Sequence, residues 1–208
     1  MIIEKVVKKD DRNVIIFFDN DEKLIIAYEI FLQNGLKKND EVSESRFSFL
    51  IEQNQIYFLK QRAFHLLGRR HHSSYELKLK LRQKGYKTEY IEQVVEELNT
   101  KGLLNDYEFA SSFCEENIRT KFWGKKKVES ELYKRGITRE IIYRVIEEKF
   151  TSGNELDNAL ELGRKKLKII RTRKIDSDKV RTKLYSFLLS KGYDYDVCKK
   201  AVEILTVE

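Results

Sequence analysis

The stretch Leu81-Arg82-Gln83-Lys84-Gly85 decides the fold, because its pattern, Leu-x-x-(Lys/Arg)-Gly, returns twice further along the chain. The later copies are Leu132-Tyr133-Lys134-Arg135-Gly136 and Leu188-Leu189-Ser190-Lys191-Gly192, so the glycines stand 51 and then 56 residues apart. Recurrence at such a spacing is typical of repeat proteins, in which one supersecondary unit cannot bury its apolar face alone. The pattern therefore predicts a chain built from three related units.

Apolar residues at fixed distances from each glycine predict a helix on both sides of it. Four residues before each motif leucine stands another aliphatic residue, and this spacing puts the two side chains on one helical face. In the three copies that residue is Leu77, Val128 and Leu184. A second apolar stripe follows each glycine, at Val94-Val95, Val145-Ile146 and Ala201-Val202. The glycine is predicted to be left-handed, just past a helix C-terminus, with a basic residue before it near the negative end of the helix dipole.

A third helix is predicted before each pair, and two start signals support this. Ser73-Ser74-Tyr75-Glu76 and Asn105-Asp106-Tyr107-Glu108 each place a capping side chain three residues before a Glu. We therefore expect three-helix repeats over residues 57–104, 105–153 and 154–208. The alternative, a single helical bundle with fortuitous glycines, requires all the flanking apolar positions to match by accident.

Residues 1–56 have a different pattern. Short runs rich in β-branched and aromatic residues, Ile2 to Val7, Val14 to Phe18 and Leu24 to Tyr28, are separated by polar turns and predict a three-stranded meander. So small a sheet is marginal alone, so we expect it to lie against a helix around Ser43 to Gln55. The stretch Gly35 to Asp40 is predicted to link the sheet to the repeats. The predicted fold is a mostly helical, elongated tandem array of three three-helix repeats with a small N-terminal antiparallel sheet of three strands.

Composition narrows the class of protein. The 208 residues include 36% charged residues and no proline, which suits an elongated, helix-dominated chain. No segment approaches 18 uninterrupted apolar residues and the N-terminus lacks an export signal, so we expect a cytoplasmic protein without a membrane contact. The two cysteines, Cys114 and Cys198, fall on predicted apolar faces and are expected to be buried thiols.

Charge is distributed unevenly along the chain. The formal net charge is +7, from 41 Lys and Arg against 34 Asp and Glu. Residues 1–56 carry 8 basic and 11 acidic side chains, residues 57–153 carry 20 and 14, and residues 154–208 carry 13 and 9. The repeats therefore hold the positive charge, which favours nucleic acid or an acidic protein groove as the partner.

Three groups of basic residues are the candidate contacts. The first is Lys78, Lys80, Arg82, Lys84 and Lys87, with Arg69 and Arg70 before it as further candidates; the second is Arg119, Lys121, Lys125, Lys126 and Lys127; the third is Arg164, Lys165, Lys166, Lys168, Arg171, Arg173 and Lys174. A solvated helix face explains the first group equally well, because its members spread around their helix. The second group lies at a predicted loop, and Phe122 and Trp123 stand between its members in the sequence. Basic side chains next to aromatic rings are suited to contacts with phosphates and bases.

Enzymatic readings of the sequence find little support. Three histidines, His65, His71 and His72, lie close together but lack an HExxH arrangement, a CxxC partner or a carboxylate at metal-ligand spacing. His71 and His72 directly precede Ser73 and are expected to face solvent or a bound anion. The nine glycines form no phosphate-binding loop. We therefore predict no catalytic centre, no metal and no cofactor.

The first two repeats resemble a known family. The string Arg70-His71-His72-Ser73-Ser74-Tyr75-Glu76-Leu77, continued by Leu81 and Lys84-Gly85, resembles the first-repeat signature of the RecX regulatory proteins, an Arg-x-His-Ser-x-x-Glu-Leu pattern. The second repeat agrees through Gly102-Leu103-Leu104-Asn105-Asp106, Phe109-Ala110, Gly124 and Glu131-Leu132. The third is similar in outline only, through Lys183-Leu184 and Leu188 to Gly192. The N-terminal strands resemble the hairpin extension of some longer members.

The resemblance implies a bacterial cytoplasmic modulator of the RecA recombinase. Members of the family lie in the groove of the RecA filament on DNA and usually restrain its growth, strand exchange and ATP hydrolysis without chemistry of their own. We accordingly expect a monomer that binds RecA and single-stranded or duplex DNA and acts in DNA repair, recombination and the SOS response. The rival hypothesis is a stand-alone nucleic-acid-binding protein of helical-repeat type. A nuclease or other hydrolase is disfavoured.

Overall fold

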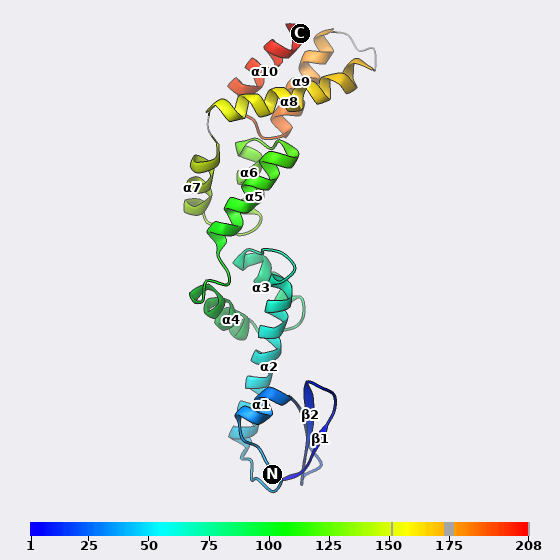
Figure 1. The fold of residues 1–208 in the computed structure, drawn as a ribbon, viewed down its shortest axis with the longest axis vertical. Coiled ribbons are helices and arrows are strands. Elements are labelled where there is room, and N and C mark those ends of the chain that lie inside the picture. The colour runs from blue at the N-terminus through cyan, green and yellow to red at the C-terminus, as the bar shows by residue number, and fades with distance from the viewer. Residues whose placement is uncertain (151, 173–176, 208) are drawn as a thin grey trace. The chain divides into compact units, whose positions relative to one another are not determined.

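The computed structural model describes residues 1–150, 152–172 and 177–207 (Figure 1). Three strands come first: β1 (Ile3–Lys8), β2 (Asn13–Phe18) and β3 (Lys23–Ala27). Helices follow: α1 (Tyr28–Gln33), α2 (Glu44–Leu67), α3 (Ser74–Arg82), α4 (Thr88–Thr100), α5 (Asp106–Lys121), α6 (Lys125–Tyr133), α7 (Arg139–Lys149), α8 (Ser152–Arg171), α9 (Ser177–Ser190) and α10 (Tyr195–Val207). None of the described helices is long and apolar enough to cross a membrane.

The strands form an antiparallel sheet in the order β1-β2-β3, which confirms the predicted meander. Side chains alternate between its two faces, so Val14, Ile16 and Phe18 of β2 are buried while their neighbours are only partly covered. These residues share a core with α1 and with Leu50 of α2. The sheet thus packs against a following helix, as its small size requires.

Two expectations about the N-terminal region are wrong. The stretch from Gly35 to Asp40 is no linker, because it lies along β1: the Asn39 N–H donates to the Ile3 carbonyl (2.8 Å) and the Ile3 N–H donates to the Asp40 carbonyl (3.0 Å). The helix expected near residues 43–55 and the first helix of the first repeat are one continuous helix, α2. The domain boundary predicted at residue 56 therefore falls inside α2.

The three-helix repeats are confirmed as α2 to α4, α5 to α7 and α8 to α10. Gly85, Gly136 and Gly192 all have positive φ, at 84°, 72° and 90°, directly after the middle helix of their repeat. Both predicted caps form as well. The Ser73 hydroxyl accepts a hydrogen bond from the Glu76 N–H (3.1 Å), and the Asn105 side chain accepts from the Tyr107 N–H (3.0 Å).

The chain divides into two compact units, which we describe separately. Unit 1 comprises Met1–His71 and Leu77–Leu103, and unit 2 comprises His72–Glu76 and Leu104–Glu208. Unit 2 contains two cores, one around Leu132 in the second repeat and one around Leu188 in the third. Cys114 and Cys198 are buried in these cores as free thiols, and burial raises the pKa of Cys114 to about 12 and that of Cys198 to about 11.

Within unit 2, the glycine turn of each repeat receives the first turn of another repeat's middle helix, an arrangement that we call an inter-repeat joint. In the third repeat, the Gly124 N–H donates to the Lys191 carbonyl (2.8 Å) and the Lys126 N–H donates to the Gly192 carbonyl (3.0 Å). A Cβ on Gly124 would lie 2.6 Å from the backbone of Gly192. The two chain segments therefore pack backbone against backbone.

The turn at Gly136 forms a joint of the same design with the segment His72–Glu76. The Ser73 hydroxyl donates to the Arg135 carbonyl (2.6 Å), and the Ser74 N–H donates to the carboxylate of Asp106 (2.7 Å). A Cβ on Gly136 would overlap the side chain of Tyr75. The motif glycine is thus required both for its conformation and for the close approach.

Candidate functional site

The first predicted basic group divides into paired and open residues. Lys78 and Arg82 project from α3 and both contact the carboxylate of Glu92 on α4 (3.3 Å from Arg82). Lys84 is exposed and makes no ion pair among the residues that the structure describes. Arg69 and Arg70 are exposed just after α2. Arg70 donates to the carbonyl of His71 (2.7 Å). The Glu92 carboxylate thus partly neutralises two of the three cations of α3, and Lys84 remains available to a ligand.

The second predicted group lies at the turn between α5 and α6, around Trp123. The Lys121 ammonium lies 4.7 Å from the centre of the Trp123 ring and the Lys127 ammonium 5.7 Å from it. Lys121 also donates to the side chain of Asn117 (2.8 Å), which is buried. Arg119 and Lys125 are exposed. The loop turns through Phe122, whose φ of 50° is left-handed and ends α5.

Lys126, in the same group, is directed toward the third repeat. Its ammonium lies 2.8 Å from the carboxylate of Asp194 and 5.3 Å from the ring centre of Tyr195. The hydrogen bond from Lys126 to Asp194 raises the pKa of the ammonium. Lys126 therefore belongs to the joint at Gly192 as well as to the basic surface.

Glu131 on α6 lies among three cations. Lys127, Lys134 and Arg135 lie 3.4, 2.8 and 2.8 Å from its carboxylate. Hydrogen bonds from Lys134 first, and then from Arg135, lower the pKa of Glu131 to about 2. The carboxylate stays ionised and fixes the three side chains, but it neutralises only one of their three charges.

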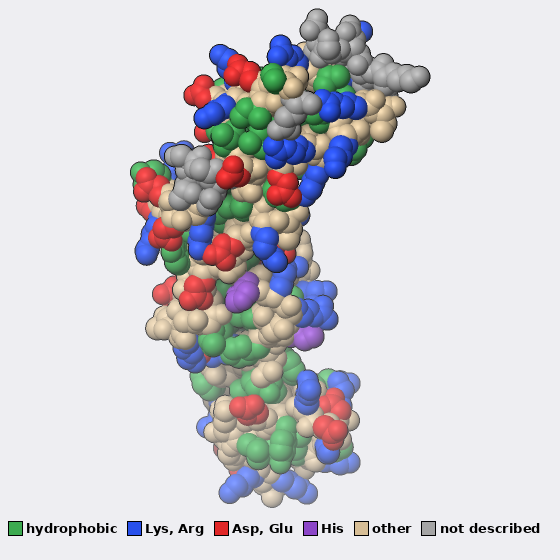
Figure 2. Space-filling model, turned by 45° about the horizontal axis from the view of Figure 1, so that its top comes forward, with side chains coloured by type: hydrophobic (Ala, Val, Ile, Leu, Met, Phe, Trp, Pro, Cys, Tyr) green, Lys and Arg blue, Asp and Glu red, His purple; other side chains and the backbone are tan. Residues whose placement is uncertain are grey.

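The third predicted group lies on α8. The Lys165 ammonium is 4.3 Å from the ring centre of Phe122 and 2.9 Å from the carboxylate of Glu161. Arg164, Lys168 and Arg171 are exposed along the same helix. Arg173 and Lys174 lie outside the described residues. Figure 2 shows blue Lys and Arg side chains in groups on the uppermost repeats, with red Asp and Glu side chains between them.

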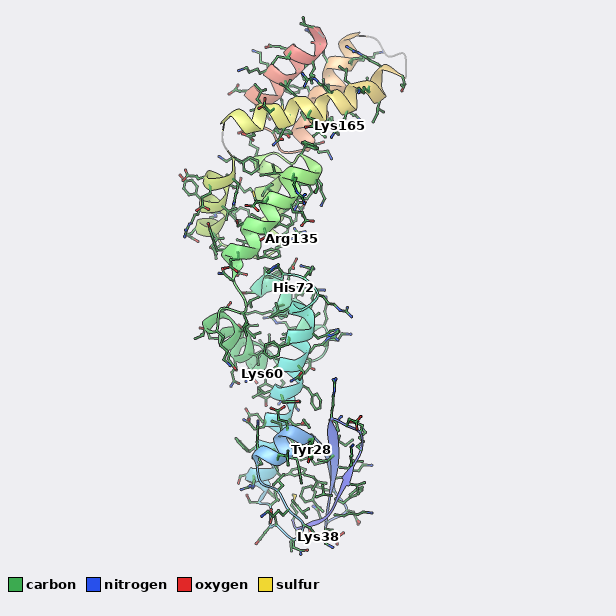
Figure 3. All side chains as sticks on the ribbon, in the orientation of Figure 1. Tyr28, Lys38, Lys60, His72, Arg135 and Lys165 are labelled. Atoms are coloured by element: carbon green, nitrogen blue, oxygen red, sulfur yellow. The ribbon has the colours of Figure 1, made fainter. Side chains whose placement is uncertain are left out.

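Arg135, Lys191 and the aromatic partners Phe113 and Phe187 were missed by the sequence prediction, whereas Lys166 belongs to the predicted third group. Arg135 stacks on Phe113, with its guanidinium carbon 4.5 Å from the ring centre, and Phe113 contacts Trp123 with ring centres 6.1 Å apart. Lys166 and Lys191 flank Phe187 at 4.9 and 5.4 Å. A signal was available, because Arg135 and Lys191 hold the same place before the motif glycine as Lys84. Arg135 and Lys165 are labelled in Figure 3.

We call Phe113, Lys121, Trp123, Lys127 and Arg135 the cation–aromatic cluster. Its rings face the cations of the same chain, so they hold ammonium and guanidinium groups in place, each contact being worth about 0.5–1 kcal/mol at an exposed site. Positioned cations that keep water contact are suited to phosphate oxygens. We call Lys166, Phe187 and Lys191 the Phe187 group. The backbone hydrogen bond from Gly124 to Lys191 joins the cluster to this group in the next repeat.

The histidines give no support to a metal site. His72 is buried, contrary to the expectation that it faces solvent, because it precedes the cap residue Ser73, which is itself buried in the joint at Gly136. His71 is exposed, as expected. Within the described residues, no group of three or more His, Cys, Asp or Glu side chains is arranged to hold a metal ion.

Family models match all three repeats of the chain. The first, second and third three-helix domains of RecX match residues 60–98, 105–146 and 154–202. The second and third matched segments begin and end close to the helix triplets α5 to α7 and α8 to α10, whereas the first begins inside α2 and ends near the end of α4.

Curated relatives align with nearly the full length of the chain. The regulatory protein RecX of Clostridium botulinum (strain Eklund 17B / Type B) is 30% identical over 202 residues, which span 96% of this chain and 92% of the relative. That of Clostridium acetobutylicum is 31% identical over 195 residues, spanning 93% and 89%.

Two solved structures share the fold. The crystal structure of a regulatory protein RecX superposes with a TM-score of 0.77 at 21% identity, covering 97% of this chain and 98% of that one. The crystal structure of RecX from Lactobacillus salivarius gives 0.66 at 23% identity, covering 75% and 99%. With three matched domains in series and relatives aligned over almost every residue, the chain belongs to the RecX family of regulatory proteins.

Proposed function

We propose that this protein is a non-catalytic regulator that binds the RecA filament on DNA and inhibits its recombinase and ATPase activities. Membership of the RecX family carries the proposal, because regulation of RecA in DNA repair is the role of this family. The protein would act as a monomer in the cytoplasm, on filaments formed on single-stranded or duplex DNA. Its contribution to recombination and to the SOS response would be restraint of the filament.

The basic surface of unit 2 supports this role. A filament on DNA presents phosphates and acidic protein surface over a long distance, and weak contacts repeated along one ligand combine into a strong one. The cation–aromatic cluster, the Phe187 group and the exposed cations of α8 provide such contacts on successive repeats of one unit. Lys84 provides a further cation in unit 1.

Binding can be tested by co-sedimentation of the protein with RecA filaments assembled on single-stranded DNA, next to DNA alone and RecA alone. We expect the protein to pellet with filaments at concentrations at which it pellets neither with DNA alone nor with RecA alone. The proposal is wrong if filaments retain no more protein than bare DNA does.

A second candidate function is stand-alone binding of nucleic acid, and the cation–aromatic cluster favours it. Under this hypothesis, affinity for bare single-stranded DNA is substantial and falls steeply with salt, with a slope near −0.7 for each phosphate neutralised. Reversing the charge at Lys84 separates the two functions. If the RecA proposal holds, Lys84→Glu weakens binding to filaments while binding to bare DNA is kept. If Lys84→Glu weakens binding to filaments and binding to bare DNA equally, the result favours simple DNA binding.

A further inference from the structure

The first repeat contains an open counterpart of the two inter-repeat joints. A cavity of about 530 Å³ lies between the beginning of α2 and the beginning of α4 in unit 1. Ser45, Ser48, Phe49 and Glu52 line it from α2, and Lys87 and Tyr90 line it from the α4 side. The lining residue Lys87 follows Gly85, the motif glycine of this repeat, by two positions in the chain. Phe49 is 49% exposed, although its ring is large and apolar.

The joints of unit 2 show which element occupies the space beside the motif glycine in the other two repeats. In the third repeat, the first turn of α6 lies between Glu155 at the beginning of α8 and Asp194 just before α10: Lys125 N–H faces Glu155 (3.5 Å) and Lys126 pairs with Asp194. In the second repeat, the first turn of α3 lies on Asp106, the first residue of α5, and on the Gly136 turn. In both cases the occupant is the N-terminal turn of a helix.

Among the residues that the structure describes, none occupies the corresponding turn of the first repeat in this way. A Cβ on Gly85 would meet no atom within 4 Å, whereas one on Gly136 or Gly192 would overlap another segment. Among the described residues, no hydrogen bond reaches the carbonyl of Lys84 or Gly85, the positions whose equivalents accept hydrogen bonds in the joints. Glu52 supplies a carboxylate on the first helix, as Asp106 and Glu155 do in the other repeats.

The charges around the cavity define the chemistry of its occupant. In the joint at Gly136, Glu76 lies three residues after the cap Ser73 and pairs with Arg135 (3.5 Å). Lys84 holds the place of Arg135 in the first repeat, and Lys87 adds a second cation where the third repeat has Asp194. The fitting occupant is a helix that begins with a small capping residue and carries an acidic residue in its first turn, a common way for a helix to begin.

We infer that this cavity, with the Gly85 turn, binds the N-terminal turn of a helix of a RecA subunit in the filament. The inference rests on the proposed function for the identity of the partner. It adds which element of RecA is recognised, namely the first turn of a helix. The free backbone N–H groups of that turn face Glu52 and the carbonyls of Lys84 and Gly85. An acidic side chain of the same turn faces Lys84 and Lys87. Burial of Phe49 under that helix turn supplies the apolar part of the contact.

The inference can be tested by filling the cavity with a large side chain in the 208-residue chain. Ser48 is exposed and lines the cavity, so Ser48→Trp blocks it without disturbing the core, and Ser48→Ala leaves it open. Gln61→Trp adds the same side chain to an exposed position of the same helix outside the cavity. We expect Ser48→Trp to weaken binding to RecA filaments by about tenfold or more. Ser48→Ala and Gln61→Trp should bind as the wild type does, and all four proteins should bind bare DNA equally.

The outcomes separate this inference from the proposed function. If the wild type binds filaments and Ser48→Trp binds equally well, the cavity inference is wrong and the regulatory function stands. If the wild type does not bind filaments, both fail together. A photo-crosslinker, p-benzoylphenylalanine, in place of Phe49 identifies the occupant. Cross-links to the beginning of a RecA helix support the inference, whereas cross-links only to a second copy of the chain, or none in bound complexes, overturn it.

Discussion

At Gly136 and Gly192 the absence of a side chain serves two purposes. The backbone there is left-handed, and the space that a Cβ would fill is taken by Tyr75 or by the backbone of Lys127. Gly85 has the same left-handed φ but open space around it. The three motif glycines therefore share a left-handed backbone conformation but differ in how closely other residues pack against them.

Substitution of these glycines separates the two effects. Gly85→Ala should lower the free energy of unfolding by about 1–2 kcal/mol, the cost of a left-handed L-residue. Gly192→Ala should cost about 1–3 kcal/mol more, because the joint must move apart to admit the methyl group. Urea unfolding followed by circular dichroism measures both values. Equal losses in the two variants would show that the joint tolerates the extra atom.

Glu131 gives the stability a defined pH dependence. Its pKa is about 2 in the folded protein and ordinarily about 4.5, so its ion pairs stabilise the fold above about pH 4.5 and are lost as the pH falls toward 2. Glu131→Gln should therefore reduce stability at pH 7 by about 1–2 kcal/mol. The difference between wild type and variant should narrow below pH 4.5. Thermal unfolding at a series of pH values tests this, and a constant difference from pH 7 to pH 2.5 would contradict it.

At the scale of elements, the periodic parts of the chain were predictable and the irregular parts were not. Each repeat carries its own start and stop signals, such as the cap at Ser73 and the glycine at 85, and these act locally. The continuous helix α2 could also have been recognised, because neither glycine nor proline stands between Ser43 and Gly68 to end a helix at residue 55. The short helix α1 has no side-chain cap, so the sequence carries no signal for its beginning.

The candidate site shows the same division. Lys121, Trp123 and Lys127 are neighbours in the sequence, so a basic and aromatic group could be predicted there. The contact of Arg135 with Phe113 joins residues 22 positions apart, and that of Lys166 with Phe187 joins two helices. The burial of His72 likewise depends on the joint at Gly136. Tertiary packing alone creates these contacts.

The cation–aromatic cluster should contribute to binding of single-stranded DNA. Lys121→Ala with Lys127→Ala removes two cations, so the affinity should fall and the slope of log affinity against log salt should decrease by about 1.4. The control removes two exposed lysines of unit 1, Lys37→Ala with Lys38→Ala, and should change neither value. Fluorescence anisotropy between 50 and 200 mM salt, roughly the range over which phosphate contacts weaken, provides the measurement. An unchanged slope in the cluster variant would exclude direct phosphate contacts.

At the scale of the whole molecule, the candidate binding residues are distributed rather than concentrated. The described residues include three repeats of one design, and their cations occur in groups on successive helices rather than around a single centre. The same motif that builds each repeat also supplies a cation at Lys84, Arg135 and Lys191. Under the proposed function, the protein acts by occupying a surface of the filament. Single substitutions should then weaken binding in steps, whereas the loss of one repeat should be far more damaging.

The rate of ATP hydrolysis by RecA on single-stranded DNA, measured with increasing amounts of this protein, tests the central claim most directly. The account predicts that hydrolysis falls when the protein is substoichiometric to RecA, and that Lys84→Glu shifts the response to higher protein concentrations. Hydrolysis that stays unchanged at a protein concentration equal to that of RecA would contradict the account.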